Sequence, residues 1–205
     1  MDMDPVPTNT VPINTVPMDL ATIEEIRQVK YRYLRCVDLK LWDELGDTLT
    51  EDAVLDTGTS AFGKLAEIIG RLEIVAFFSA KLGPAVLTGH TASQPEITVD
   101  GDMATGIWSY RETVLSTRHR MVIAGTGFCE ESYERCADAR WRIARIGYLR
   151  SYEAMASLDD LPSFKITAAL GSLEALGSLE PLNGADGHPV ATAPGAAVPG
   201  LDAWR

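Results

Sequence analysis

One histidine stands where it could transfer a proton. His90 begins a segment that reads as a β-strand running into the turn Asp100-Gly-Asp. Near neutral pH an imidazole accepts one proton and returns it, and a carboxylate bonded to its other nitrogen fixes the tautomer and raises its basicity. Asp38 is the best candidate for that carboxylate, because it interrupts an otherwise apolar stretch of the first predicted helix and a buried aspartate needs a partner. The residues alone also allow an exposed aspartate and a core histidine.

Aromatic side chains give candidates for the wall of a pocket. Trp108, Tyr110 and Glu112 alternate along one predicted strand, so their side chains share one face. On that face Tyr110 could donate a hydrogen bond to an oxyanion and Trp108 could stack on a flat ring. Phe128 and Tyr148 are candidate walls of the same pocket. Aromatic residues at strand spacing also form plain core, so both interpretations stay open.

No motif predicts a metal or a cofactor. The chain lacks His-x-His, Cys-x-x-Cys and His-Glu-x-x-His, the usual spacings of metal ligands. It also lacks a Gly-rich dinucleotide or phosphate loop, and Ser60 and Ser93 stand in no nucleophile elbow. We therefore expect chemistry that needs no cofactor.

Charge and composition narrow the class of partner. The 18 basic and 29 acidic residues give a formal charge of −11, which repels nucleic acid and anionic membranes. No stretch approaches the roughly 20 apolar residues that span a bilayer, and the N-terminus lacks the regions of a signal peptide. Three cysteines at no metal-ligand spacing suit a reducing compartment. We expect a cytoplasmic protein that binds a small molecule, without nucleic acid or membrane.

The chain of 205 residues reads as one domain between two tails. Residues 1–18 hold the near-repeat NTVPI-NTVPM and predict a flexible arm. Residues 19–155 carry the regular patterns of a single domain. Residues 156–205 are predicted to be weakly structured and then flexible, because their Ala, Pro and Gly content buries too little apolar surface to offset the ordering entropy.

Helices are predicted first and strands second within the domain. Thr22 and Glu25 form a capping box, which predicts a helix from Thr22 to about residue 40. Shorter helices are predicted over 41–49 and 73–82. Glycine-containing turns and alternating residues predict strands later in the chain. The predicted strands cover residues 53–56, 87–99, 103–116, 121–136 and 140–153.

This order describes an α+β fold, in which a curved antiparallel sheet packs against the N-terminal helices and encloses a pocket. Several motifs resemble, in the same order, the SnoaL-like branch of the nuclear-transport-factor-like superfamily, which includes scytalone dehydratase and bile acid 7α-dehydratase. The resemblance covers about residues 19–153. The motifs are Asp38 with Trp42, His90 with Gln94, Asp100-Gly-Asp-Met-Ala, Gly127-Phe128, and Arg135 followed by Asp138 and Trp141-Arg-Ile.

The resemblance implies a cone-shaped α+β barrel, a dimer or trimer, and a pocket for a hydrophobic, frequently cyclic substrate. It implies that Asp38 and His90 are the acid–base unit of a dehydratase, and that Gln94 lies where many relatives have an asparagine in the pocket. Two positions depart from the most similar dehydratase. Val37 stands in place of a tyrosine, and Trp108 in place of a second histidine.

Other functions stay open at this point. The same pair would serve an isomerase or a cyclase. Some members of the superfamily use the fold as a non-catalytic scaffold, which needs no inward pair of Asp38 and His90. An epoxide-opening enzyme would gather carboxylates and an arginine around a water, for which Glu112 and Arg111 are the candidates.

Overall fold

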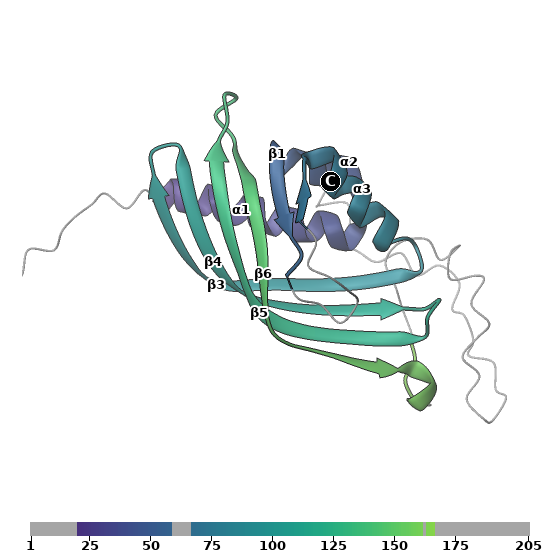
Figure 1. The fold of residues 1–205 in the computed structure, drawn as a ribbon. Coiled ribbons are helices and arrows are strands. Elements are labelled where there is room, and N and C mark those ends of the chain that lie inside the picture. The colour runs from purple at the N-terminus through teal and green to yellow at the C-terminus, as the bar shows by residue number, and fades with distance from the viewer. Residues whose placement is uncertain (1–19, 59–66, 162, 167–205) are drawn as a thin grey trace, which may run out of the picture.

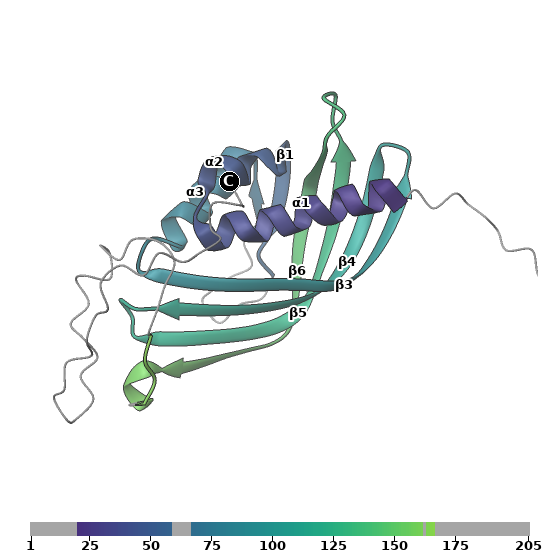
Figure 2. The ribbon, with the colours of Figure 1, turned by 180° about the vertical axis from the view of Figure 1, so that it is seen from behind.

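The computed structural model describes residues 20–58, 67–161 and 163–166. Three helices pack on one face of a six-stranded sheet (Figures 1 and 2). None of the described helices has the length and apolar content to cross a membrane. The elements in chain order are α1 (Leu20–Leu39), α2 (Trp42–Asp47), β1 (Leu49–Asp56), β2 (Glu67–Ile69), α3 (Arg71–Lys81), β3 (Val86–Asp100), β4 (Met103–Ser116), β5 (Met121–Arg135), β6 (Trp141–Ser157) and the 3₁₀ turn η1 (Leu158–Asp160).

The sheet is mixed and open, with strand order β2-β1-β6-β5-β4-β3. The long strands β3 to β6 form an antiparallel meander, as the sequence predicts. The expected purely antiparallel sheet is wrong in one detail, because β1 pairs parallel with β6. Register shifts lie between Ser93 and Glu96, between Thr126 and Gly127, and between Ser132 and Tyr133. Such bulges bend strands, and the meander curves around α1 (Figure 1). The α+β class is confirmed.

The core lies between α1 and the concave face of the sheet. Ile26, Tyr33 and Val37 on α1 are buried with Ile143 and Ile146 on β6. Buried and exposed residues alternate along β4 and β5, since successive side chains of a strand point to opposite faces. This alternation decides which strand residues reach the site and which face outward.

Element boundaries differ modestly from the predictions. Helix α1 begins at Leu20, so Thr22 lies inside the helix instead of capping it. Strand β2 has three residues, too few for a sequence pattern, and was not predicted. Strand β6 runs to Ser157 and continues into η1. The predicted arm, residues 1–18, and residues 167–205 of the predicted extension lie outside the described residues.

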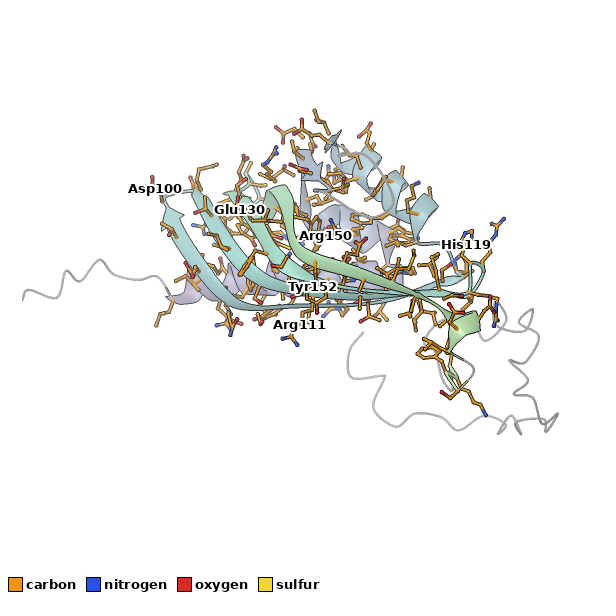
Figure 3. All side chains as sticks on the ribbon, turned by 60° about the horizontal axis from the view of Figure 1, so that its bottom comes forward. Asp100, Arg111, His119, Glu130, Arg150 and Tyr152 are labelled. Carbon is orange, nitrogen blue, oxygen red and sulfur yellow. The ribbon has the colours of Figure 1, made fainter. Side chains whose placement is uncertain are left out.

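The convex face of the sheet carries exposed apolar side chains. Ile107, Phe128, Leu149 and Tyr152 are each more than 40% exposed. Figure 3 shows Tyr152 with Arg111 and Glu130 on the sheet. Phe128 on β5 pairs with Ser109 on β4. Arg111 lies two residues after Ser109 and Glu130 lies two residues after Phe128, so the two charges lie on opposite sides of Phe128 along the antiparallel strands.

We expect this face to bind a second copy of the chain, because a two-fold contact centred near Phe128 would bring Arg111 of each copy opposite Glu130 of the other. Phe128→Glu should then convert the oligomer to a monomer in analytical ultracentrifugation. Leu72→Glu is the matched control, since Leu72 is also exposed but lies on α3. A wild-type chain that is monomeric at high protein concentration would contradict this prediction.

Candidate active site

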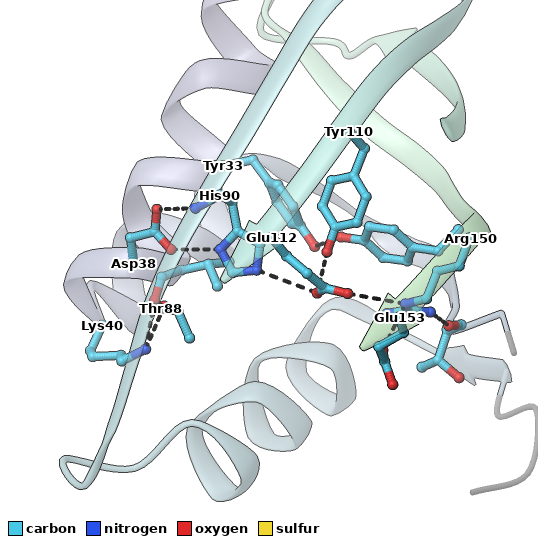
Figure 4. A network of polar contacts seen from close by, with 12 residues as sticks. Tyr33, Asp38, Lys40, Thr88, His90, Tyr110, Glu112, Arg150 and Glu153 are labelled. Atoms are coloured by element: carbon cyan, nitrogen blue, oxygen red, sulfur yellow. Dashed lines mark hydrogen bonds and ion pairs between the residues drawn. The ribbon is translucent and has the colours of Figure 1, made fainter. Parts of the chain in front are cut away.

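The structure brings Asp38 and His90 together. One carboxylate oxygen, Oδ1, lies 2.5 Å from His90 Nδ1, and Oδ2 accepts the backbone N–H of His90 at 3.0 Å (Figure 4). A carboxylate only accepts hydrogen bonds when ionised, so Nδ1 carries a proton, and in the neutral ring Nε2 is the nitrogen with the lone pair. Asp38 thus fixes both the tautomer and the orientation of the imidazole.

The end of α1 is clamped to β3 beside this pair. Lys40 follows the helix with a positive φ of 61°, which ends the helical path. Its ammonium donates to the carbonyl of Val37 at 3.2 Å and to the hydroxyl of Thr88 at 3.0 Å. Burial lowers the pKa of Lys40, and nearby Asp38 opposes that shift. These contacts hold the Asp38 backbone against the strand that carries His90.

A second carboxylate lies on the other side of the imidazole. Glu112 is the β4 partner of His90, and its Oε2 lies 4.0 Å from His90 Nε2. Glu112 is 9% exposed and accepts hydrogen bonds from the Tyr110 hydroxyl and, at 3.1 Å, from Arg150 Nε. His90 therefore lies between two carboxylates, with Nε2 facing the interior one.

Arg150 completes this network, and sequence reasoning missed it. Its guanidinium contacts Glu153 at 3.2 Å, donates to the carbonyl of Thr57 at 2.7 Å, and lies over the Tyr148 ring at 5.5 Å. The arginine named from the sequence, Arg111, is exposed on the convex face and takes no part. The bulge in β6 beside Gly127 shifts the strand register by one residue there. Counting alternate residues along the sequence therefore does not show that Arg150 points to the concave face.

Two glycines of β5 make room for the network. An added Cβ would lie 2.9 Å from Glu112 Oε1 at Gly125, and 2.1 Å from the carbonyl oxygen of Leu149 at Gly127. Glycine within a strand marks a bulge or a close approach. The sequence Gly125-Thr-Gly127 was therefore a signal that could have located the site on β5.

Tyrosines form the wall of the site. The Tyr110 ring stacks on His90, with ring centroids 6.1 Å apart, and contacts the Tyr148 ring at 5.1 Å. The hydroxyls of Tyr148 and Tyr33 lie 3.3 Å apart. Burial is the main cause that raises the pKa of all three tyrosines. They keep their protons across the neutral range and act as hydrogen-bond donors.

Three predicted pocket residues lie elsewhere. Trp108 is fully buried, and its ring N–H donates to the Tyr133 hydroxyl at 2.9 Å, so it is core. Phe128 is 47% exposed on the convex face, since it alternates with buried Cys129. Gln94 is exposed in the β3 bulge with a φ of 52°, which turns it away from the strand pattern. Of the predicted walls, Tyr110 stacks on His90, and Tyr148 contacts Tyr110.

A groove of about 440 Å³ runs between α1 and β3. Tyr31, Leu34, Asp38 and His90 are among its lining residues, so the pair also borders open space on the outside of the edge strand. Its volume is within the range of small-molecule sites. Among the described residues, no group of three or more His, Cys, Asp or Glu side chains is arranged to hold a metal.

Comparison with known proteins decides the family. Residues 18–147 match the model of the SnoaL-like domain. The chain belongs to the SnoaL-like family. This agrees with the resemblance noted in the sequence.

Solved structures share the fold of this SnoaL-like chain at low sequence identity. The Kfla4162 protein of Kribbella flavida is 24% identical, with a TM-score of 0.60 over 66% of this chain and 95% of that one. A type 2 hexachlorocyclohexane dehydrochlorinase, LinA, is 18% identical, with a TM-score of 0.58 over 67% and 90%. A putative scytalone dehydratase from Novosphingobium aromaticivorans is 18% identical, with a TM-score of 0.57 over 66% and 87%.

The space beside Gly125 gives a test of the network. Gly125→Ala should lower the free energy of unfolding by about 1–3 kcal/mol, because the new methyl group displaces the Glu112 carboxylate. Gly89→Ala is the control, since an added Cβ there meets nothing within 4 Å. Urea unfolding of both variants measures the difference. Equal stability of the two variants would contradict the close approach of Glu112.

Proposed function

We propose that the protein is an enzyme that acts by acid–base chemistry without a cofactor, and that it is a dehydratase for a small, hydrophobic, cyclic substrate. The observation that carries this proposal is the bond between Asp38 Oδ1 and His90 Nδ1. It leaves Nε2 as a base facing Glu112 and Tyr110.

In the proposed reaction Nε2 removes a proton from the carbon next to a carbonyl. The electrons of the broken C–H bond form an enolate, and the imidazolium then gives the proton to the hydroxyl group on the β-carbon. The C–O bond breaks, water leaves, and a conjugated double bond remains. His90 is neutral again at the end, so one histidine serves as both base and acid.

The charges around His90 support this cycle. Two carboxylates, Asp38 and Glu112, lie within 4.0 Å of the ring nitrogens and favour the imidazolium that forms in the first step. The hydroxyls of Tyr33 and Tyr148 share one hydrogen bond, which leaves the second hydroxyl proton for another acceptor. Tyr148 is the more exposed of the two, so we assign its O–H to the enolate oxygen.

The substrate class follows from the walls and the charges. Tyr31, Leu34 and Leu39 line the groove beside Asp38 and His90 and give it an apolar wall for a hydrophobic substrate. On the interior side of His90, the two carboxylates of Glu112 and Glu153 surround one guanidinium, that of Arg150, which disfavours an anionic substrate. We therefore expect neutral cyclic β-hydroxy ketones to react and their carboxylated analogues to react poorly.

A panel of such ketones tests the proposal by the absorbance of the enone product. Asp38→Asn and His90→Gln should each lower kcat/KM by about 10²- to 10⁴-fold, the usual contribution of a general acid–base. His119→Gln should match the wild type, because His119 is exposed between β4 and β5. Full activity of His90→Gln on a substrate that the wild type converts would contradict the assignment.

The role of Tyr148 has its own test. Tyr148→Phe should lower kcat by about 10²- to 10³-fold, the typical cost of one oxyanion donor. Tyr152→Phe is the matched control, since Tyr152 is 60% exposed on the convex face. A Tyr148→Phe variant that changes KM alone would show that Tyr148 binds the substrate without stabilising the enolate.

Epoxide hydration is the second candidate, favoured by the contacts of Arg150 with both Glu112 and Glu153. Here one carboxylate would activate a water that attacks the epoxide carbon, while an acid protonates the opening oxygen to give a diol. Glu153→Gln separates the two, because it should abolish diol formation and leave enone formation intact. Isomerase and cyclase reactions would use the same His90 and differ in product. A scaffold has no need for the inward pair.

A further inference from the structure

A second buried network joins α1 to the sheet, away from His90. Lys30 on α1 forms an ion pair with Glu131 on β5, and both side chains are fully buried. The second oxygen of Glu131 accepts the Tyr133 hydroxyl, and that hydroxyl accepts the Trp108 ring N–H at 2.9 Å. Each of these four side chains has a polar partner within the network, and none of them contacts the imidazole of His90.

Stability alone is a weak reason for such a pair. Taking two charges out of water costs free energy that their attraction only partly offsets, so apolar residues of similar volume often serve as well. What the pair adds is a fixed position of the helix on the sheet. An apolar contact between a helix and a sheet tolerates sliding, whereas a buried ammonium must meet its carboxylate and holds the helix at one position.

That position matters at the end of the same helix. Asp38 follows Lys30 by eight residues, which is about 12 Å along a rigid α-helix. Lys30 also lies 5.4 Å from the centre of the Tyr33 ring, and the Tyr33 hydroxyl contacts that of Tyr148. The position that the ion pair sets for α1 therefore also affects the positions of the Asp38 carboxylate and of the Tyr33 and Tyr148 hydroxyls.

We propose that Lys30 and Glu131 are positioning residues, whose buried ion pair sets the place of α1 on the sheet so that Asp38 meets His90 Nδ1. Their effect on catalysis rests on the proposed function. Their effect on the Asp38–His90 hydrogen bond does not, which makes the two separable by experiment.

The test compares the double variant Lys30→Met with Glu131→Gln against the wild type. This variant removes both charges and keeps an acceptor for Tyr133. The readout is the proton NMR signal of the short hydrogen bond between His90 Nδ1 and Asp38, which lies far downfield of ordinary ring N–H signals. Asp38→Asn assigns the signal by abolishing it. Arg71→Met is the matched control, because it breaks the ion pair with Glu51, which is 91% exposed.

In the folded double variant we expect the signal to move upfield or vanish, and kcat on any substrate to fall about 10²-fold with little change in KM, as for a catalytic group displaced by 1 Å. The Arg71→Met control should keep signal and kcat. An unchanged signal in a folded double variant would overturn the proposal, whatever the activity. If the double variant does not fold, Glu131→Asp replaces it. Glu131→Asp keeps the negative charge but moves the carboxylate away from Lys30 by one methylene group. An unchanged signal in this variant would also overturn the proposal.

Discussion

The carboxylate of Asp38 makes the contact on which the site depends. It bonds the ring and the backbone of the same residue, His90, and so joins the end of α1 to the edge strand of the sheet. An edge strand has backbone groups without a neighbouring strand, and Asp38 supplies the missing acceptor for one of them. The bond that orients the imidazole therefore also holds the helix on the sheet.

The curved meander supplies the rest of the site. Because β3, β4, β5 and β6 lie side by side in register, one row across the concave face holds His90, Glu112, Gly125 and Glu153. The row beside it holds Tyr110 and, past the β6 bulge, Arg150. Charges from distant parts of the sequence meet here because the sheet aligns them, and Gly125 leaves the space in which they meet.

Sequence reasoning reached the fold and the two central residues. Helical spacing and turn signals located α1, α3 and the four long strands, since these depend on local patterns. Asp38 and His90 were found because a polar residue in an apolar stretch and a histidine at the head of a strand both need a partner. The family resemblance gave the same two positions.

The predictions from sequence failed where they depended on which face of the sheet a strand residue lies on, or on a contact between residues far apart in the sequence. Phe128 was placed in the pocket, but it lies on the convex face, since the parity of a bulged strand is not readable from its residues. Arg150 was missed for the same reason. Lys30 was not identified from the sequence, because nothing local marks a lysine whose carboxylate partner lies 101 residues later.

We infer that Asp38 holds the proton on Nδ1 of His90 and leaves Nε2 as the base. The most direct measurement is a long-range ¹H–¹⁵N NMR spectrum of the histidine rings at neutral pH, assigned with His90→Gln. We expect neutral His90 to carry its proton on Nδ1, with the ¹⁵N shift of an unprotonated nitrogen at Nε2. A neutral ring protonated on Nε2 would contradict it, because Asp38 would then face a lone pair and no base would face the site.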